Sequence, residues 1–263
     1  MKIALTIAGS DSGGGAGIQA DLKTFHQFGV FGTSALVAIT AQNTRGVTAV
    51  FAIPEEIVRA QLRALADDLP PDAVKTGMLA TSDLVGAVAD AIEEHGFRNY
   101  VLDPVMVATS GDRLLDRDAE RTVRERLVPL AAVVTPNLDE ASLLVEEEID
   151  TVERMERAAK ILVGLGAAAA LVKGGHLQAD EMVDVLRVGD TVRRFNHPKI
   201  ETTSTHGTGC TLSSGIAAGL ALGRSIERAA ADALDFVRRA ITTAPGLGRG
   251  HGPLNHFVAA PQP

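Results

Sequence analysis

The 263-residue chain has few aromatic residues and a single cysteine. Phe, Tyr and Trp together make up 3% of the residues, and Trp is absent. A protein that stacks nucleic-acid bases on aromatic side chains needs more of them, so we do not expect such a surface. Cys210 cannot form an intramolecular disulfide without a second cysteine, which is consistent with the reducing environment of the cytoplasm.

Positive charge and long apolar runs are also scarce. Lys and Arg number 25 against 33 Asp and Glu, and the formal net charge is −8, so a surface that follows nucleic-acid phosphates is not expected. No apolar run approaches the roughly 20 residues of a membrane-spanning helix. The N-terminal apolar stretch is too short for a signal peptide, and we expect it to be a buried first strand. We therefore expect neither a nucleic-acid nor a membrane partner.

Short apolar runs alternate with longer segments of helical periodicity along the chain. The predicted strands are Ile3–Ala8, Ser34–Thr40, Ala73–Thr76, Tyr100–Leu102, Ala132–Thr135, Ala169–Val172 and a hairpin of Met182–Arg187 with Thr191–Asn196. The predicted helices are Ala20–Phe28, Glu55–Asp67, Asp83–His95, Asp116–Val128, part of Ile149–Leu165, Leu212–Ala221 and Ile226–Ala244. This alternation predicts an α/β fold, with a mainly parallel central sheet and helices on both faces, in one domain over residues 1–263.

Polar clusters follow several of the predicted strands. They are Gly9-Ser10-Asp11, Gln42-Asn43, Asp103-Pro104, Asn137–Glu140 and Lys173-Gly174. Ligands of open α/β sheets bind beyond the carboxyl ends of the strands. The pattern therefore predicts a binding site at that edge of the sheet.

The motif with the most chemical content is His206-Gly207-Thr208-Gly209-Cys210-Thr211, just before the predicted helix Leu212–Ala221. Two glycines allow the backbone to turn tightly near a ligand, and a helix start offers free N–H groups to an anion. The same field would favour the thiolate of Cys210. The motif thus predicts an anion site beside a base, while a glycine-rich loop with a buried structural cysteine is an alternative. Zinc binding by His206 and Cys210 is disfavoured because three or four protein ligands are usual.

The glycine-rich segment Gly9–Gly17 fits neither the dinucleotide fingerprint nor the P-loop, so it indicates either close ligand approach or a flexible turn.

Four further residues are ordinary when taken singly. Asp before Pro is usually a turn, Asn-x-x-Glu is often a helix cap, and a Lys at a strand end is usually solvated. Together they supply oxygen ligands for Mg²⁺ and a cation for phosphates, which phosphoryl transfer from ATP requires. These residues are Asp103, Asn137, Glu140 and Lys173.

At Gly207–Cys210 the chain resembles the ribokinase superfamily, and more closely the hydroxymethylpyrimidine/phosphomethylpyrimidine kinases. The matching segments are Ile7–Ser12, Thr40–Thr44, Lys75–Leu79, Asp103–Val107, Thr135–Asn137 with Glu140, Val172–His176 and Gly250–Phe257. Most of the superfamily has Asp as the base where Cys210 stands, and cysteine is typical of this branch. The resemblance implies a ribokinase-like three-layer sandwich. It also implies ATP-dependent phosphorylation of 4-amino-5-hydroxymethyl-2-methylpyrimidine and of its monophosphate, which yields the diphosphate for thiamine biosynthesis.

The resemblance further implies roles for individual residues. Gln42 would recognise the pyrimidine, because a carboxamide offers the donor and acceptor that an aminopyrimidine edge complements. The pyrimidine pocket would be shaped by Asp21, Gly9, Met78 and Val105. The phosphates of ATP would be bound by Asp103, Asn137, Lys173, Gly207, Thr208 and Gly209. Cys210 would be the general base, Asp103 and Glu140 would act on Mg²⁺, and Thr109–Asp116 would be a flap that excludes water.

Three alternatives are open at this point. A pyridoxal kinase, or a dual-specificity enzyme, shares the fold and the cysteine, although the context of Gln42 favours the pyrimidine. A regulator without catalytic activity would not need Cys210, Lys173 and Asp103 together. A dinucleotide-dependent oxidoreductase conflicts with the absent fingerprint. The resemblance suggests a homodimer, and from the length of 263 residues we expect no fused thiamine-phosphate synthase.

Overall fold

One sheet runs through the computed structural model, which describes residues 1–106, 117–175 and 181–261. The sheet has nine strands in the order β3-β2-β1-β4-β5-β6-β7-β8-β9. The strands are β1 (Ile3–Asp11), β2 (Phe31–Asn43), β3 (Gly46–Ala52), β4 (Ala73–Thr76), β5 (Tyr100–Leu102), β6 (Val133–Val134), β7 (Ala169–Val172), β8 (Glu181–Val188) and β9 (Thr191–Pro198). The six neighbouring strands from β2 to β7 are parallel, whereas β3, β8 and β9 pair antiparallel at the two edges.

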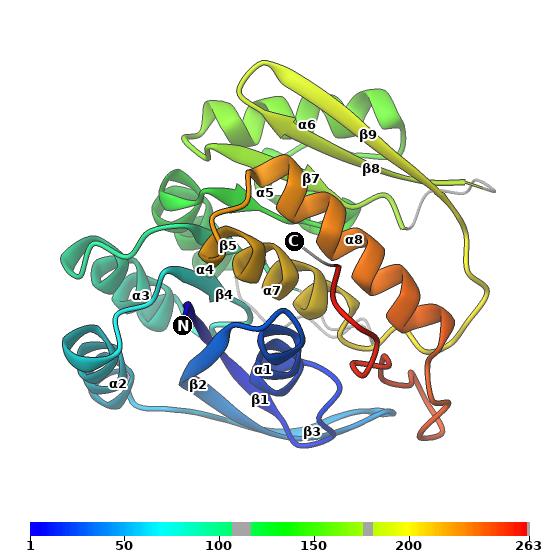
Figure 1. Ribbon diagram of the computed structural model, residues 1–263. Helices are drawn as coiled ribbons and strands as arrows, with labels where there is room; N and C mark the ends of the chain where they lie inside the picture. The colour runs from blue at the N-terminus through cyan, green and yellow to red at the C-terminus, as the bar shows by residue number, and fades with distance from the viewer. Residues whose placement is uncertain (107–116, 176–180, 262–263) are drawn as a thin grey trace.

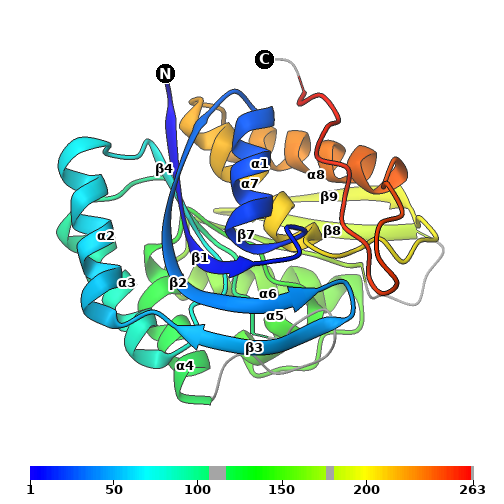
Figure 2. The ribbon, with the colours of Figure 1, turned by 90° about the horizontal axis from the view of Figure 1, so that it is seen from below.

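Helices cover both faces of this sheet, which makes the three-layer sandwich that the sequence predicts (Figure 1). One face carries α1 (Gly17–Gln27), α7 (Thr208–Ala221) and α8 (Ile226–Thr242). The other carries α2 (Glu55–Asp68), α3 (Ser82–Glu94), α4 (Arg117–Thr122), α5 (Leu138–Val145) and α6 (Val152–Gly164). Figure 2 shows the two groups on opposite sides of the sheet. After α4 the chain continues as a π-helical turn, Val123–Leu127, and a 3₁₀ turn, Val128–Leu130.

Alternating side chains of the central strands fill two separate cores. Tyr100 and Leu102 of β5 lie in the core beneath α2–α6, whereas Val101 lies in the core beneath α1, α7 and α8. Successive strand residues point to opposite faces, and both faces are covered, so the central strands are continuously apolar. Within the described ranges, no helix is long and apolar enough to cross a membrane.

The structure confirms the predicted strands and the hairpin, and it adds elements that the sequence patterns did not indicate. The strand β3 was not predicted because its residues are mostly exposed and show no buried face. The helix α5 was not predicted either, although the Asn137–Glu140 cap that starts it was considered. The helix α7 begins at Thr208 rather than Leu212, so the motif that ends at Thr211 forms its first turn.

Candidate active site

The polar clusters that follow the strands lie along one edge of the sheet, in the order of the strands. From β2 to β7 the predicted site residues along this edge are Gln42, Gly9, Met78, Asp103, Asn137 and Lys173. Of the residues predicted to contact the pyrimidine, Gln42 and Gly9 lie near the carboxyl ends of β2 and β1, whereas Met78 follows β4 and Val105 follows β5. Those predicted to contact the phosphates follow β5, β6 and β7. The α7 helix packs on β1, β4 and β5, so its first turn lies between the two groups.

Hydrogen bonds and close packing hold the pyrimidine side of the site. The N–H of Gly9 donates to the Met78 carbonyl at 3.2 Å, and a Cβ on Gly9 would lie 2.7 Å from Cε of Met78. A side chain at position 9 would therefore displace the end of the Met78 side chain. The N–H of Gln42 donates to Ser12 Oγ at 2.8 Å, and Ser12 Oγ donates to the Gln42 carbonyl at 2.7 Å. These bonds fix the backbone from which the Gln42 carboxamide extends.

Two carboxylates and one ammonium form the phosphate side of the site. Lys173 Nζ lies 3.4 Å from Asp103 Oδ1 and 3.9 Å from Glu140 Oε2. Burial raises the pKa of Glu140 to about 7, against the effect of Lys173, and the charge of Asp103 adds to the rise. Burial lowers the pKa of Lys173, but Asp103 and Glu140 outweigh it, so that pKa is raised. Lys173 is therefore a firmly charged cation between two buried acids.

Asn137 and Glu140 form the helix cap considered from the sequence. The N–H of Glu140 donates to Asn137 Oδ1 at 2.8 Å, and the N–H of Asn137 donates to Glu140 Oε2 at 2.9 Å. This capping box starts α5. Asn137 also pairs with Lys173 in an isolated parallel bridge, which brings the ends of β6 and β7 together. The cap thus has a structural role and also places Glu140 beside Lys173.

The start of α7 has the features of an anion site. No side chain caps the helix, and its first turn contains no acidic residue. Gly207 has φ +83°, and a Cβ there would lie 1.8 Å from the Gly15 carbonyl oxygen. Gly209 leaves room for the Lys173 ammonium, since a Cβ on Gly209 would lie 3.3 Å from Lys173 Nζ. The N–H of Thr208 donates to the Thr205 carbonyl at 3.3 Å, which leaves the N–H groups of Gly207, Gly209 and Cys210 for an anion. The first turn that carries them faces Lys173 and Asp103.

The thiol of Cys210 is in a different state from the one expected. Burial raises its pKa to about 11, and the charges of Asp21 and Asp103 raise it further, whereas Lys75 lowers it. The expectation that the helix start favours the thiolate is therefore wrong. The side chain is partly exposed. Desolvation by the surrounding protein outweighs the helix field, so the thiol is protonated at neutral pH.

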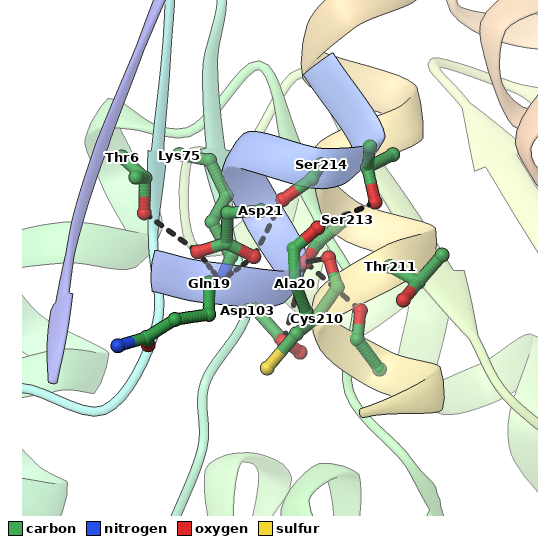
Figure 3. Close-up of polar contacts among 12 residues, drawn as sticks. Thr6, Gln19, Ala20, Asp21, Lys75, Asp103, Cys210, Thr211, Ser213 and Ser214 are labelled. Carbon is green, nitrogen blue, oxygen red and sulfur yellow. Dashed lines mark hydrogen bonds and ion pairs between the residues drawn. The ribbon is translucent and has the colours of Figure 1, made fainter. Parts of the chain in front are cut away.

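Asp21 lies beneath the site, not in its open part. It was expected to shape the pyrimidine pocket, but its side chain is fully buried and both carboxylate oxygens accept hydrogen bonds. Figure 3 shows these bonds, which come from Thr6 Oγ1 at 2.6 Å, Ser214 Oγ at 2.7 Å and Lys75 Nζ at 2.9 and 3.0 Å. Asp21 therefore does not contact a ligand directly, and it can influence one only through Thr6, Ser214 and Lys75.

Several polar residues of the site had not been assigned from the sequence. Ser213 Oγ donates to Asp103 Oδ2 at 3.2 Å, which joins α7 to the phosphate side. His206 Nε2 lies 2.8 Å from Asp11 Oδ2, which also accepts the N–H groups of Gly15 and Ala16. Lys75 is buried in the short strand β4. A lysine inside an apolar strand was the one signal in the sequence that could have indicated it.

The described residues provide part of a metal site. Nowhere among them do three or more His, Cys, Asp or Glu side chains cluster so that they could hold a metal ion alone. Asp103 and Glu140 both lie within 4 Å of the same Lys173 Nζ. Two carboxylates fit Mg²⁺, which is commonly bound by one or two carboxylates together with substrate phosphates. The expected flap, Thr109–Asp116, lies outside the described residues.

The chain is similar to known proteins over nearly its full length. Residues 11–255 match the phosphomethylpyrimidine kinase family. A hydroxymethylpyrimidine/phosphomethylpyrimidine kinase from Rhizobium meliloti is 53% identical over 258 residues, which cover 97% of both chains. The thiamine biosynthesis bifunctional protein ThiED from Geobacter sulfurreducens is 50% identical over 256 residues, 97% of this chain and 52% of that protein. The crystal structure of a Bacillus subtilis pyridoxal kinase with ADP is 43% identical, with a TM-score of 0.91 over 97% of both chains.

Proposed function

We propose that the site at the sheet edge phosphorylates both hydroxymethylpyrimidine and its monophosphate. The chain belongs to the phosphomethylpyrimidine kinase family and is a hydroxymethylpyrimidine/phosphomethylpyrimidine kinase of the thiamine pathway. The observation that carries this proposal is the order of residues along that edge. Gln42, Gly9 and Met78 lie on one side, and Lys173 with its two acids lies on the other. The first turn of α7 stands between them, where a phosphoryl group would pass.

In the first reaction, Gln42 binds the aminopyrimidine edge and Met78 and Val105 hold the ring. The thiolate form of Cys210 removes the proton of the substrate CH₂OH, and the alkoxide oxygen attacks the γ-phosphorus of ATP in line. The bond to the bridging oxygen breaks, and ADP leaves. The N–H groups of Gly207–Cys210 stabilise the charge on the transferred group. In the second reaction a phosphate oxygen of the monophosphate is the nucleophile.

The ATP phosphates lie on the other side of the transferred group. Lys173 neutralises part of their charge, and Asn137 and Thr208 contact them. Mg²⁺ held by Asp103 and Glu140 would supply further positive charge when bound. Ser213 fixes the direction of the Asp103 carboxylate through its 3.2 Å hydrogen bond. These side chains position the nucleotide, and positioning with charge stabilisation accounts for most phosphoryl-transfer catalysis.

A single assay tests this function. ADP release should be measured in parallel with hydroxymethylpyrimidine, its monophosphate and pyridoxal as acceptors. We expect ADP release with both pyrimidines, at one active site, so that the two pyrimidines compete with each other. Absence of ADP release with both pyrimidines would overturn the proposal.

Pyridoxal phosphorylation is the second candidate activity. The observation in its favour is the likeness to the B. subtilis pyridoxal kinase, at a TM-score of 0.91. Both substrates carry a hydroxymethyl group on a six-membered heteroaromatic ring, so the same nucleophile and anion site would serve both. They differ at the ring edge, where Gln42 faces an aminopyrimidine or a pyridine with different hydrogen-bonding groups.

Replacing Gln42 with Leu should weaken pyrimidine use while the fold is kept. The substitution removes the carboxamide but leaves the backbone bonds to Ser12 in place. Loss of a paired amide typically costs on the order of 1–3 kcal/mol, a roughly ten- to hundredfold loss. The measurement is kcat/KM for hydroxymethylpyrimidine at saturating ATP. Gln61→Leu is a control, since that glutamine bonds the backbone of Leu36. Wild-type efficiency of Gln42→Leu would contradict the recognition role.

We also propose that two copies of the chain associate through the β2–β3 hairpin. Ile39 and Phe51 lie opposite each other in the antiparallel pair, and they are 48% and 64% exposed. Val50 on the same edge strand is 53% exposed. An exposed apolar edge strand marks an interaction surface, and the family resemblance suggests a homodimer.

Phe51→Glu should therefore convert the dimer to a monomer. A charge on this strand would have to be desolvated in the interface, and we expect dimerisation to weaken by roughly a hundredfold or more. Analytical ultracentrifugation over a concentration series measures this. Val192→Glu, on the strand β9 at the opposite edge, is the matched control and should remain dimeric. A wild-type chain that is monomeric at every concentration would refute the proposed interface.

The remaining proposals concern the whole chain. We propose that residues 1–263 form one kinase domain, because all nine described strands lie in one sheet. We also propose that the enzyme works in the cytoplasm, which agrees with its single, free cysteine.

A further inference from the structure

A fully buried ion pair lies behind the active site. Lys75 of β4 and Asp21 of α1 are both 0% exposed, and Lys75 Nζ lies 2.9 and 3.0 Å from the two carboxylate oxygens. Removing two charges from water is costly, and an apolar pair of similar volume is often at least as stable. The stability of the fold alone therefore does not explain why β4 carries a lysine among apolar residues.

The pair is connected to the helix turn that carries Cys210. Ser214 Oγ donates to Asp21 Oδ1 at 2.7 Å, and Ser214 lies one helical turn after Cys210 on α7. Residues four apart share a face of a helix, so the face that bears Cys210 also contacts Asp21. Thr6 Oγ1 of β1 donates to Asp21 Oδ2 at 2.6 Å. The carboxylate thus joins β1, β4 and α7 to α1, as Figure 3 shows.

The ammonium also lies against the loop that leads to the pyrimidine pocket. A Cβ on Gly77 would lie 2.9 Å from Lys75 Nζ, so the space for the ammonium depends on the glycine before Met78. Lys75 is therefore linked to the pyrimidine side of the site through Gly77. It is linked to the helix turn of Cys210, the proposed base, through Asp21 and Ser214.

The charge of Lys75 reaches Cys210. Burial raises the pKa of the thiol, and Lys75 is the strongest influence that lowers it. Asp21 of α1 and Asp103 after β5 act in the opposite direction, and each acts less strongly than Lys75. Lys173 after β7 is also close enough to interact with the thiol. The net effect of the Asp21–Lys75 pair on Cys210 is therefore that of a positive charge.

We propose that Lys75 is a positioning residue for the phosphoryl transfer: held by Asp21, it anchors the first turn of α7 and places a buried positive charge beside Cys210. This proposal rests on the proposed role of Cys210 as the base. The anchor keeps the thiol and the anion site in one orientation, and the charge stabilises the thiolate that the reaction uses.

The test is the reactivity of Cys210 in the free enzyme. Cys210 is the only cysteine, so iodoacetamide reports on one thiol. The double variant Lys75→Met with Asp21→Asn removes both charges and leaves no unpaired buried carboxylate. We expect alkylation at a given pH to be about tenfold slower, and its pH profile to move to higher pH by about one unit. We also expect a larger change in kcat than in the KM for ATP, with kcat reduced. The matched control is Lys2→Met with Asp72→Asn, a half-exposed pair at the other end of the strands, which should behave as wild type.

Ser214→Ala provides the second variant if the double variant does not fold. It removes only the hydrogen bond between Asp21 and α7, and we expect alkylation and kcat both to fall by a smaller factor. Wild-type alkylation and kcat in a folded variant would overturn the proposal, even if its melting temperature were lower. The alkylation result does not depend on whether Cys210 is the base. A failure of the Lys75 proposal is thus distinguishable from a failure of the proposed function, which Cys210→Ala tests.

Discussion

Removal of divalent cations is expected to reduce turnover by at least about a thousandfold. Asp103 and Glu140 are buried next to Lys173, so two acidic groups face one cation where the ATP phosphates are proposed to bind. Without a divalent cation, these acids would repel the phosphates of ATP. A bound metal supplies several kcal/mol of charge stabilisation in such reactions, and about 4 kcal/mol corresponds to roughly a thousandfold in rate.

The measurement is single-turnover transfer after thorough treatment with EDTA, followed by addition of Mg²⁺. Restored activity shows that the enzyme was still folded, and nucleotide binding followed by fluorescence gives a second readout. Asp103→Asn should raise the Mg²⁺ concentration for half-maximal rate, whereas Asp90→Asn, on the surface of α3, should not. Activity that survives complete chelation would contradict the role of Asp103 and Glu140.

Glu140 adds a pH dependence to the metal requirement. Burial raises the pKa of this carboxyl to about 7, so it is about half protonated near neutral pH. A metal ligand must be ionised, and the ionised fraction falls as the pH falls through about 7. The Mg²⁺ concentration for half-maximal rate should therefore rise as the pH is lowered from about 8 to about 6.

The position of the site could be predicted from the sequence because it depends on local patterns. Strands such as β5 and β7 are short apolar runs buried on both faces, and the polar residues that follow them must lie at one edge of a parallel sheet. The order of those residues along the edge depends on the strand order, which no local pattern contains. Pairing of β1 with both β2 and β4 places Gly9 beside Met78.

The electrostatic state of the site could not be predicted from the sequence. A helix start lowers the pKa of a thiol, and that rule gave the expectation for Cys210. The opposing effect is burial of the thiol. The elements that pack on α7, which include β1, β4 and α1, are distant from it in the sequence. The buried pair of Asp21 and Lys75 depends on the same tertiary packing, because 54 positions separate the two residues. The strand β3 was not predicted for a related reason: exposure leaves no alternation of buried and polar residues.

Cys210→Ala is expected to reduce the rate of the chemical step by roughly 10²–10⁴-fold, the usual range for general-base catalysis. The variant keeps the N–H groups of α7, Lys173 and the two acids, so ATP and the pyrimidine should bind with little change. Cys210→Asp should recover part of the rate, because a carboxylate takes the place of the thiolate as base. If Cys210 had only a structural role, Cys210→Ala would lower the melting temperature while each folded molecule kept the normal rate.

The pH dependence decides whether the thiolate is the reactive form. Burial raises the pKa of Cys210 to about 11, so the thiolate fraction below that value rises about tenfold per pH unit. If the thiolate is the base, kcat/KM of the wild type should increase from about pH 7 to about pH 10. An ordinary carboxyl is already ionised over this range, so the profile of Cys210→Asp should be nearly flat. The test measures single-turnover rates and melting temperatures of the wild type and both variants over this pH range. These data show whether the thiolate of Cys210 is the base. An unchanged rate in Cys210→Ala would remove the thiol from the mechanism, and parallel pH profiles of the wild type and Cys210→Asp would assign the titration to another group.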